Sequence, residues 1–536
     1  MKKERFFATI IMILCMGTGI VFAGGSGQSS GGTPVASGPV NVTYPITTEG
    51  AKSLTFWLPI QPPAARHINN YSDQEIFQII SKNTGINMTY YHPAVGQEQE
   101  QLNILVASGD LPDIIQIRGL YSGGSSVGVS DGIFRDLTNL IRTHAPDYLR
   151  EITKTEINYR LATDNEGRIT EFQIIKQSAP AFNRMNYRQD VMDQLGLKIP
   201  VTIADLESDF AKMKTAGLTA FMPQANGKID LLMWVYGTTP GFFIGTDGNI
   251  KWGEAEPGYR QYLELMNKWD NSGYISPDFM SNLNDVERRS MFTTNTVSMI
   301  IQPVDLVKSA ADAVGIKIVP LPYPRLTAGQ QIHFQPVSFE TRPLLNESMA
   351  TVITTSCKNP EIAAEYLNYY YTPEGADLAN WGIKDYTYTV DASGKKTFTD
   401  NMLRNPKIPL ADIQTMLKIH LIAKLSEADV VCNPNVVINE EALELRMRYS
   451  DDKTIDDSQI LPAFAMSLKD NQSRNEIMRD INTYVNEMTL KFITGVTPLS
   501  DFDSYIAQIK KMNLDEAIRL TQAGYTQFKN KPGYSR

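Results

Sequence analysis

The stretch Gly124–Gly128 reads G-S-S-V-G and matches G-x-S-x-G, the pattern in which Ser126 would be a nucleophile for acyl transfer. Such a serine needs a strand before it and a helix directly after it, so that its hydroxyl is exposed and faces the helix dipole. The residues that follow, Val129-Ser130-Asp131-Gly132, cannot start a long helix. His333 or His420 would have to act as the base, and neither lies in a motif. We interpret the pattern as a chance match in a glycine- and serine-rich loop and predict no catalytic residue.

The sequence also lacks the usual motifs of metal-binding and phosphate-binding sites. The histidines are isolated in the sequence, with no H-x-x-x-H or C-x-x-C spacing; they are His67, His92, His144, His333 and His420. The acidic pairs Asp451-Asp452 and Asp456-Asp457 lack the glycine and the terminal glutamate of a calcium loop. No G-x-x-x-x-G-K-S/T loop occurs. We therefore expect no metal and no cofactor, while paired carboxylates for glycoside hydrolysis stay open because their separation is a spatial property.

Composition excludes another class of partner. The 536 residues carry a net charge of −9, and no basic run is concentrated enough to indicate nucleic-acid binding. A chain of this length can form two or more hydrophobic cores.

The N-terminus has the pattern of an export signal. Lys2, Lys3 and Arg5 precede the apolar run Phe6–Phe22, and Ala23 offers a cleavage site. A retained membrane anchor is the competing interpretation, because the apolar run is close to spanning length. We predict a signal peptide over 1–23 and a flexible tether over 24–50, where Gly, Ser, Thr, Pro and Val predominate.

The cysteines bear on whether the protein carries a lipid anchor and on whether it contains a disulfide bond. Cys15 follows Ile13-Leu14 and so lacks the small residue of a lipoprotein cleavage site, which argues against a lipid anchor. Cys357 and Cys432 would pair in an oxidising compartment or remain two buried thiols, and the sequence leaves both open.

The elements that follow the tether alternate between strand and helix. Strands are expected at 54–57, 86–91 and 114–117, with helices at 72–83 and up to Ser108 between them. Gly109 and Pro112 end the second helix, since one accepts a left-handed conformation and the other lacks a backbone donor. This βαβαβ order predicts a parallel sheet with right-handed crossovers, extended by a helix at 137–151.

A second set of elements follows. Helices are expected at 201–214 and 258–271 and strands at 316–320 and 352–355. Asn359 and Pro360 begin a further helix, with Gly375 beyond its end, and 412–529 is mainly helical.

Five stretches carry a resemblance to a known family. They are SGDLPDII (108–115), NYRQDVMDQLGLKIPVTIADL (186–206), MFTTNTVSMI (291–300), KNPEIAAEYLNYYYTPEG (358–375) and WGIKDYTYTVDASGK (381–395). In this order the chain resembles the extracellular solute-binding proteins of ABC importers, in the large carbohydrate-type (family 1, LipO-like) group. The resemblance implies an α/β, two-lobe periplasmic-binding-protein fold of type II-like form, with crossing hinge segments and a helical C-terminal part. The implied lobes are 51–180 plus 346–403, and 181–345 plus 404–536.

Candidate ligand-binding residues follow from strand ends and from the resemblance. A sugar offers apolar C–H faces and hydroxyls, so its receptor needs aromatic rings beside planar polar groups. Arg118 and Tyr121 follow the strand at 114–117, whose carboxyl end is where ligands bind in such sheets. The resemblance adds positions at which relatives build the cleft, namely Trp57, Trp234, Tyr236 and Gln302. The alternatives are that the tryptophans fill cores, that Arg118 forms a solvated ion pair and that Gln302 caps a helix.

The resemblance implies a function without covalent chemistry. We expect an exported, monomeric protein, periplasmic or at the cell surface, that binds a carbohydrate between its lobes, with an oligosaccharide as the favoured ligand. The closed form would dock on ABC-transporter permease subunits in the membrane. A peptide-binding receptor of the same fold and a secreted hydrolase remain the alternatives.

Overall fold

The computed structural model describes residues 41–117, 119–177, 183–223, 228–281, 283–335, 341–343, 350–409, 412–413, 424–425, 432–433, 436–437, 440–449 and 451–534. The predicted signal peptide, the tether up to residue 40, Arg118 and His420 lie outside these residues. Within the described ranges, no helix has both the length and the apolar character needed to cross a lipid bilayer.

The first sheet has the order β12-β3-β1-β2. Strands β1, β2 and β3 run parallel, and β12 closes the sheet in the opposite direction next to β3. The expected βαβαβ order is therefore confirmed. The elements are β1 (Ser53–Trp57), α1 (Glu75–Thr84), β2 (Asn87–Tyr91), α2 (Glu98–Ser108), β3 (Ile114–Gln116), α3 (Gly124–Ser130), α4 (Thr138–His144), α5 (Pro146–Ile152), α6 (Glu156–Ala162) and β12 (Thr351–Ile353).

Local signals set the ends of these helices. Gly85 and Gly109 follow α1 and α2 in the left-handed conformation, with φ of 71° and 73°. The single helix expected at 137–151 is wrong, because Ala145 leaves the helical conformation and Pro146 starts α5 as its first residue. Proline removes a backbone donor and cannot continue α4.

The second sheet has the order β10-β5-β9-β6. Strand β5 runs antiparallel to both β9 and β10, and β6 runs parallel to β9. The elements are β5 (Asn183–Arg188), α7 (Gln189–Leu195), α8 (Ile203–Thr215), β6 (Phe221–Met222), α9 (Asp230–Trp234), β7 (Phe242–Ile244), β8 (Ile250–Trp252), α10 (Pro257–Asn271), α11 (Asp285–Thr293), β9 (Met299–Pro303), α12 (Val304–Asp312) and β10 (Ile318–Pro320).

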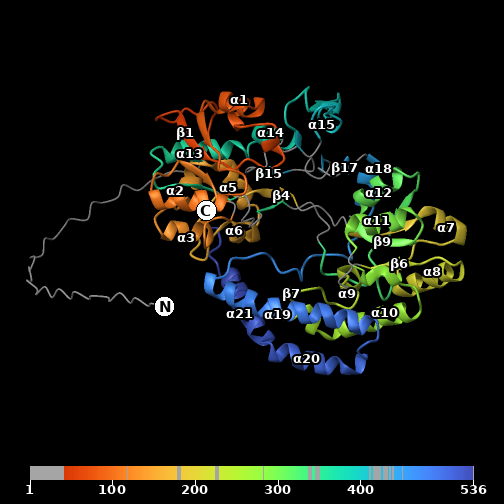
Figure 1. Ribbon diagram of the computed structural model, residues 1–536. Helices are drawn as coiled ribbons and strands as arrows, with labels where there is room; N and C mark the ends of the chain where they lie inside the picture. Colours follow the sequence, from red (N-terminus) through yellow and green to blue (C-terminus); the bar gives the residue numbers. More distant parts are fainter. Residues whose placement is uncertain are drawn as a thin grey trace, which may run out of the picture. The chain divides into compact units, whose positions relative to one another are not determined.

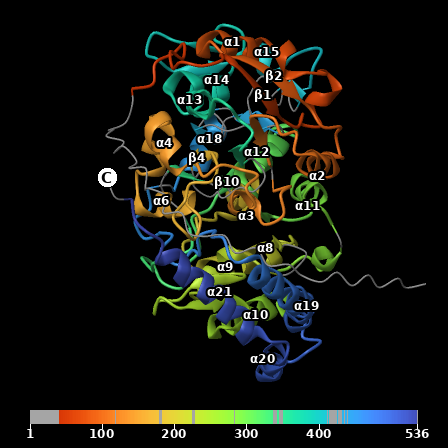
Figure 2. The same cartoon turned by 90° about the vertical axis from the view of Figure 1, so that its left-hand side faces the viewer.

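The C-terminal part is mainly helical where it is described, as expected. It returns to the second core, because α19 packs against α10 and against α21 (Figures 1 and 2). Helix α13 ends at Tyr369, before the expected stop at Gly375, which lies inside a separate helix begun by Pro373. The elements are α13 (Pro360–Tyr369), α14 (Pro373–Trp381), β13 (Tyr388–Val390), β14 (Lys396–Phe398), α15 (Asp400–Leu403), β16 (Cys432–Asn433), β17 (Val436–Val437), α18 (Glu440–Met447), α19 (Leu468–Ile493), α20 (Phe502–Lys511) and α21 (Leu514–Lys529).

Each four-stranded sheet has its own large hydrophobic core. The first core draws on residues from Ile46 to Ile175 and then from Ile353 to Ala379. The second draws on residues from Met185 to Phe334 and then from Leu445 to Ala517. The chain therefore passes between the two cores more than once.

Three of these passages meet in one small sheet of order β11-β4-β15. Strand β4 (Ile175–Gln177) lies between the first core and β5, and it pairs antiparallel with β11 (Thr341–Pro343) and parallel with β15 (Lys424–Leu425). Backbone hydrogen bonds across this sheet hold the connecting segments together, so that they form one linking sheet rather than separate loops.

Candidate functional site

The carboxyl-terminal edge of the second sheet gathers polar side chains. Residue Asn183 of β5 pairs with Pro303 of β9, and Asn186 pairs with Pro320 of β10. The ends of β9 and β10 therefore lie beside the start of β5, and β6, which is parallel to β9, ends at the same edge. Ligands of α/β proteins bind outside the carboxyl ends of such strands.

Several polar atoms at this edge are buried without a hydrogen-bond partner among the described residues. They are Nη1 of Arg184, Oδ1 of Asn186 and the hydroxyl oxygen of Tyr323. The three residues are 2% exposed or less. Because buried polar atoms in folded proteins are nearly always hydrogen-bonded, this concentration marks the edge as a candidate binding site.

The electrostatics of Arg184 are unusual for a buried arginine. Its guanidinium carbon lies 4.1 Å from the ring centroid of Tyr323 and 5.5 Å from that of Tyr449. Burial lowers the pKa of Arg184. The negative charge of Asp452 raises the pKa of Arg184 and so opposes the effect of burial. That carboxylate is, however, already paired with Arg325, with an Nη2–Oδ2 distance of 2.6 Å.

Trp234 lies beside this group. Its ring packs edge-on against Tyr323 with centroids 5.4 Å apart, and its Nε1 donates to Oγ1 of Thr239 at 3.1 Å. The side chain is 6% exposed and belongs to the second core. Trp234 therefore fills core space and at the same time supports Tyr323 at the sheet edge.

Gln302 lies at the same edge, but its amide is engaged. Its Oε1 accepts from Nη1 of Arg289 at 2.5 Å, and its Nε2 donates to the carbonyl oxygen of Asp285 at 2.9 Å. Both partners belong to α11, so the side chain holds that helix against β9. Gln302 therefore does not cap the helix that follows it, since the N-cap of α12 is Pro303 and no side chain caps that helix.

Tyr236 is placed differently from Trp234. Burial and the charges of Glu207 and Glu264 raise its pKa to about 12. Those carboxylates belong to α8 and α10, so the Tyr236 hydroxyl lies near these helices and is not brought together with Arg184 and Tyr323.

The corresponding edge of the first sheet contains Trp57, Gln116 and Thr351. Trp57 ends β1 and is 5% exposed, in a small apolar cluster with Ile115 and Val352. Thr351 pairs with Gln116 across β12 and β3, and its Oγ1 is buried without a hydrogen-bond partner among the described residues. Thr351 thus gives this edge an unpartnered hydroxyl, as Tyr323 does for the second sheet.

Tyr121 follows β3 but is held against its own loop. Its hydroxyl donates to Oδ2 of Asp131 at 2.7 Å, and its ring lies edge-on to Phe134 at 4.9 Å. Burial and the contact with Asp131 raise its pKa to about 12. The other residue predicted for this loop, Arg118, lies outside the described residues.

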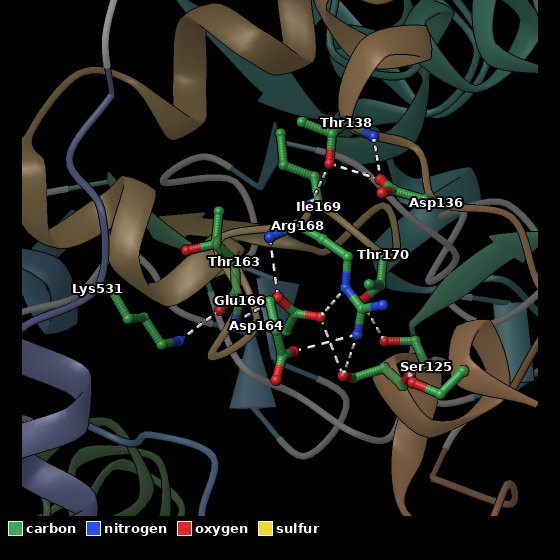
Figure 3. A network of polar contacts seen from close by, with 12 residues as sticks. Ser125, Asp136, Thr138, Thr163, Asp164, Glu166, Arg168, Ile169, Thr170 and Lys531 are labelled. Carbon is green, nitrogen blue, oxygen red and sulfur yellow. Dashed lines mark hydrogen bonds and ion pairs between the residues drawn. The ribbon is translucent and has the colours of Figure 1, made fainter.

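Ser126 lies inside the short helix α3 and joins a polar network with the loop after α6. Figure 3 shows Asp164 and Arg168 of that loop. Its hydroxyl donates to Oδ2 of Asp164 at 3.0 Å and accepts from Nη2 of Arg168 at 3.3 Å. Arg168 also donates to the same carboxylate at 2.8 Å. These contacts tie α3 to the loop after α6, and the carboxylate that accepts from Ser126 is at the same time paired with Arg168.

Other groups with reactive side chains are engaged in the structure. The described histidines bond to carboxylates or to a carbonyl oxygen, in the pairs His67–Asp412, His144–Glu365, His333–Asp456 and His92–Leu58. In the described ranges no three His, Cys, Asp or Glu side chains are grouped as metal ligands. Cys357 is a buried free thiol, and the side chain of Cys432 is outside the described residues.

Sequence reasoning missed Arg184, Asn186, Tyr323 and Thr351. One signal was present: in NRMNYR (183–188) the polar residues Arg184, Asn186 and Arg188 alternate with the core residues Met185 and Tyr187. Alternation means that one strand face is polar, and here that face is buried.

Comparison with known proteins gives relatives of one kind. No protein-family model matches the chain. Over 531 residues it is 21% identical to the fructooligosaccharide ABC transporter substrate-binding protein FusA of Streptococcus pneumoniae, covering 91% of this chain and 92% of FusA. Over 289 residues it is 26% identical to the polygalacturonan/rhamnogalacturonan-binding protein YtcQ of Bacillus subtilis, covering 50% of this chain and 52% of YtcQ. The crystal structure of alginate-binding protein AlgQ2 matches with a TM-score of 0.60 at 20% identity, covering 88% of this chain and 98% of AlgQ2.

These matches confirm the predicted fold class, an α/β solute-binding-protein fold of two lobes. The relatives found by sequence are binding proteins for carbohydrates, as their names state.

Proposed function

We propose that this chain is the extracytoplasmic substrate-binding component of an ABC importer, and that it binds an oligosaccharide between its two lobes. The observation that carries the proposal is the set of buried polar atoms at the carboxyl-terminal edges of both sheets for which no described residue is a partner, with aromatic rings beside them. Sugar hydroxyls both donate and accept hydrogen bonds, and their C–H faces pack on rings. FusA and YtcQ, which are named for carbohydrate ligands, support the choice of ligand.

The proposed mechanism is closure around the ligand. A ligand shifts a protein toward a closed form only through contacts that are stronger in that form, which requires groups from both lobes. Thr351 would supply such a group from the first sheet, and Arg184 and Tyr323 from the second. The linking sheet of β4, β11 and β15 is where the connecting segments would bend. The closed monomer would then dock on the permease subunits.

Thermal unfolding of residues 24–536 with a panel of oligosaccharides, peptides and amino acids tests the proposal. A glycan at about a hundred times its Kd should raise the unfolding free energy by about 2.7 kcal/mol if it binds only the folded form. Chromatography of the glycan after incubation should recover it unchanged. A shift with peptides alone would overturn the choice of ligand, and consumption of the glycan would indicate the secreted hydrolase.

A matched pair of variants locates the site. Trp234→Phe removes the Nε1 donor and alters the contact with Tyr323, so it should weaken glycan binding. Trp252→Phe makes the same change at a tryptophan of β8 that is 1% exposed, and it should leave the glycan-induced shift intact. Equal losses in both variants would place the site elsewhere.

A further inference from the structure

Arg184 is a buried cation for which the described residues supply no ion pair and no hydrogen bond. It is 2% exposed, and none of the residues that the structure describes accepts a hydrogen bond from its Nη1. The other arginine on the same face of β5, Arg188, is paired with Asp190 at 2.6 Å and donates to the carbonyl oxygen of Phe292 at 2.7 Å. Burying a charge without a partner is strongly unfavourable, so an unpaired buried arginine indicates a site at which a bound group supplies the opposite charge.

The surroundings of Arg184 offset this cost only in part. The rings of Tyr323 and Tyr449 present faces that attract a cation. Asp452 lies close enough to act on Arg184, but it is the ion-pair partner of Arg325, whose own positive charge opposes that of Arg184. Among the described residues that act on Arg184, one carboxylate, that of Asp452, thus faces two guanidinium groups, those of Arg184 and Arg325.

The unpartnered atoms also indicate what kind of anion fits. Nη1 of Arg184 and the hydroxyl of Tyr323 are both available donors, because burial raises the pKa of Tyr323 and keeps its hydroxyl protonated. A carboxylate has one charge and two oxygens in a plane, which matches a guanidinium and one further donor. A phosphate monoester brings up to two charges and three oxygens, and needs more donors than these.

We propose that Arg184 and Tyr323 bind the carboxylate of an acidic sugar residue, so that the ligand of this protein is a uronate-containing oligosaccharide. The inference rests on the proposed function and narrows its ligand class. A neutral glycan would offer hydroxyls to these donors but would leave the guanidinium charge uncompensated. The acidic sugar supplies both the acceptor atoms and the missing charge.

Isothermal titration calorimetry tests this inference with a panel of galacturonate, glucuronate and mannuronate oligosaccharides and their carboxyl-reduced, neutral counterparts of equal length. At least one acidic oligosaccharide should bind about 100-fold more tightly than its neutral counterpart, as expected for a buried charge pair. Arg184→Gln should weaken that binding by about 100-fold and weaken binding of the neutral counterpart far less, because a glutamine amide can still donate to a hydroxyl. Arg479→Gln makes the same change of net charge at a side chain that is 74% exposed, and it should bind like the wild type.

The outcomes separate the two proposals. If neutral oligosaccharides bind as tightly as acidic ones, or if Arg184→Gln weakens neither, the uronate inference is wrong and the carbohydrate receptor stands. If no glycan of either kind binds, the proposed function fails first. Thermal unfolding of unliganded Arg184→Gln checks its fold, and it should unfold at the same temperature as the wild type or higher, because an uncompensated buried charge is gone. A lower unfolding temperature would make Arg184 a structural residue and contradict the inference.

Discussion

Replacement of Lys531 by methionine should change how the stability of this protein depends on pH. Lys531 follows α21, which packs in the second core, yet its Nζ donates to the carbonyl oxygen of Arg160 at 2.9 Å. It also donates to the carbonyl oxygen of Thr163, beside which it lies in Figure 3. Both acceptors lie at the end of α6, beside the first core. The side chain is 4% exposed. It is therefore a buried cation that fastens the C-terminal segment to the first core.

The size of the effect follows from its pKa. Burial lowers the pKa of Lys531 from 10.5 to about 8, although Asp164 and Glu166 oppose the shift. The folded state therefore releases this proton at a lower pH than the unfolded state does. Between those two values the unfolded state binds more protons, so stability rises with pH. From about pH 7.5 to about pH 9.5 the gain is about 2 kcal/mol.

Urea unfolding of the wild type and Lys531→Met at these two pH values measures the gain. The wild type should gain about 2 kcal/mol relative to the variant as the pH rises. Tyrosines such as Tyr369, whose pKa burial raises to about 12, also affect stability at high pH, but they are common to both proteins and cancel in the comparison. Lys529→Met, at an exposed lysine two residues earlier, is the control and should show no such difference. A difference between wild type and Lys531→Met that does not change with pH would refute the reasoning.

Two further predictions concern the second core. Burial raises the pKa of Asp209 to about 6, so the free energy of unfolding should fall as the pH rises from about 4 through 6. In urea unfolding, Asp209→Asn should therefore be more stable than the wild type by about 2 kcal/mol at pH 7, and equal pH profiles would contradict this. A Cβ on Gly253 would lie 1.6 Å from the carbonyl oxygen of Thr239, so Gly253→Ala should lower the free energy of unfolding by about 3 kcal/mol or more. Because Thr239 accepts the hydrogen bond of Trp234, the variant should also weaken glycan binding. Stability near that of the wild type would show that the backbone approach at Gly253 is not tight.

Local signals in the sequence predicted many elements correctly. Gly109 and Pro112 marked the turn between α2 and β3, and Thr202 begins α8 with a capping box in which it and Asp205 exchange hydrogen bonds. Such signals are readable because each involves residues within one turn of the chain. The break at Pro146 was equally local, and the helical periodicity on both sides of it concealed it.

The candidate site was less predictable. The resemblance led to the prediction that Trp234 and Gln302 bind ligand, but their hydrogen bonds to Thr239 and to α11 could not be read from their positions in the sequence. Arg184 and Tyr323 come from strands and loops far apart in the sequence, and only the pairing of β5 with β10 brings them together.

The sequence by itself determined the alternation of strands and helices, the α/β class and the absence of the usual catalytic, metal and phosphate motifs, because these depend on neighbouring residues and on composition. Only the tertiary structure decided which polar groups are left without partners. Whether an arginine is paired depends on every element packed around it, and here two tyrosine rings occupy the place of a carboxylate beside Arg184. Burial and partnership are properties of long-range packing, and they make Arg184 the residue on which the choice of ligand depends.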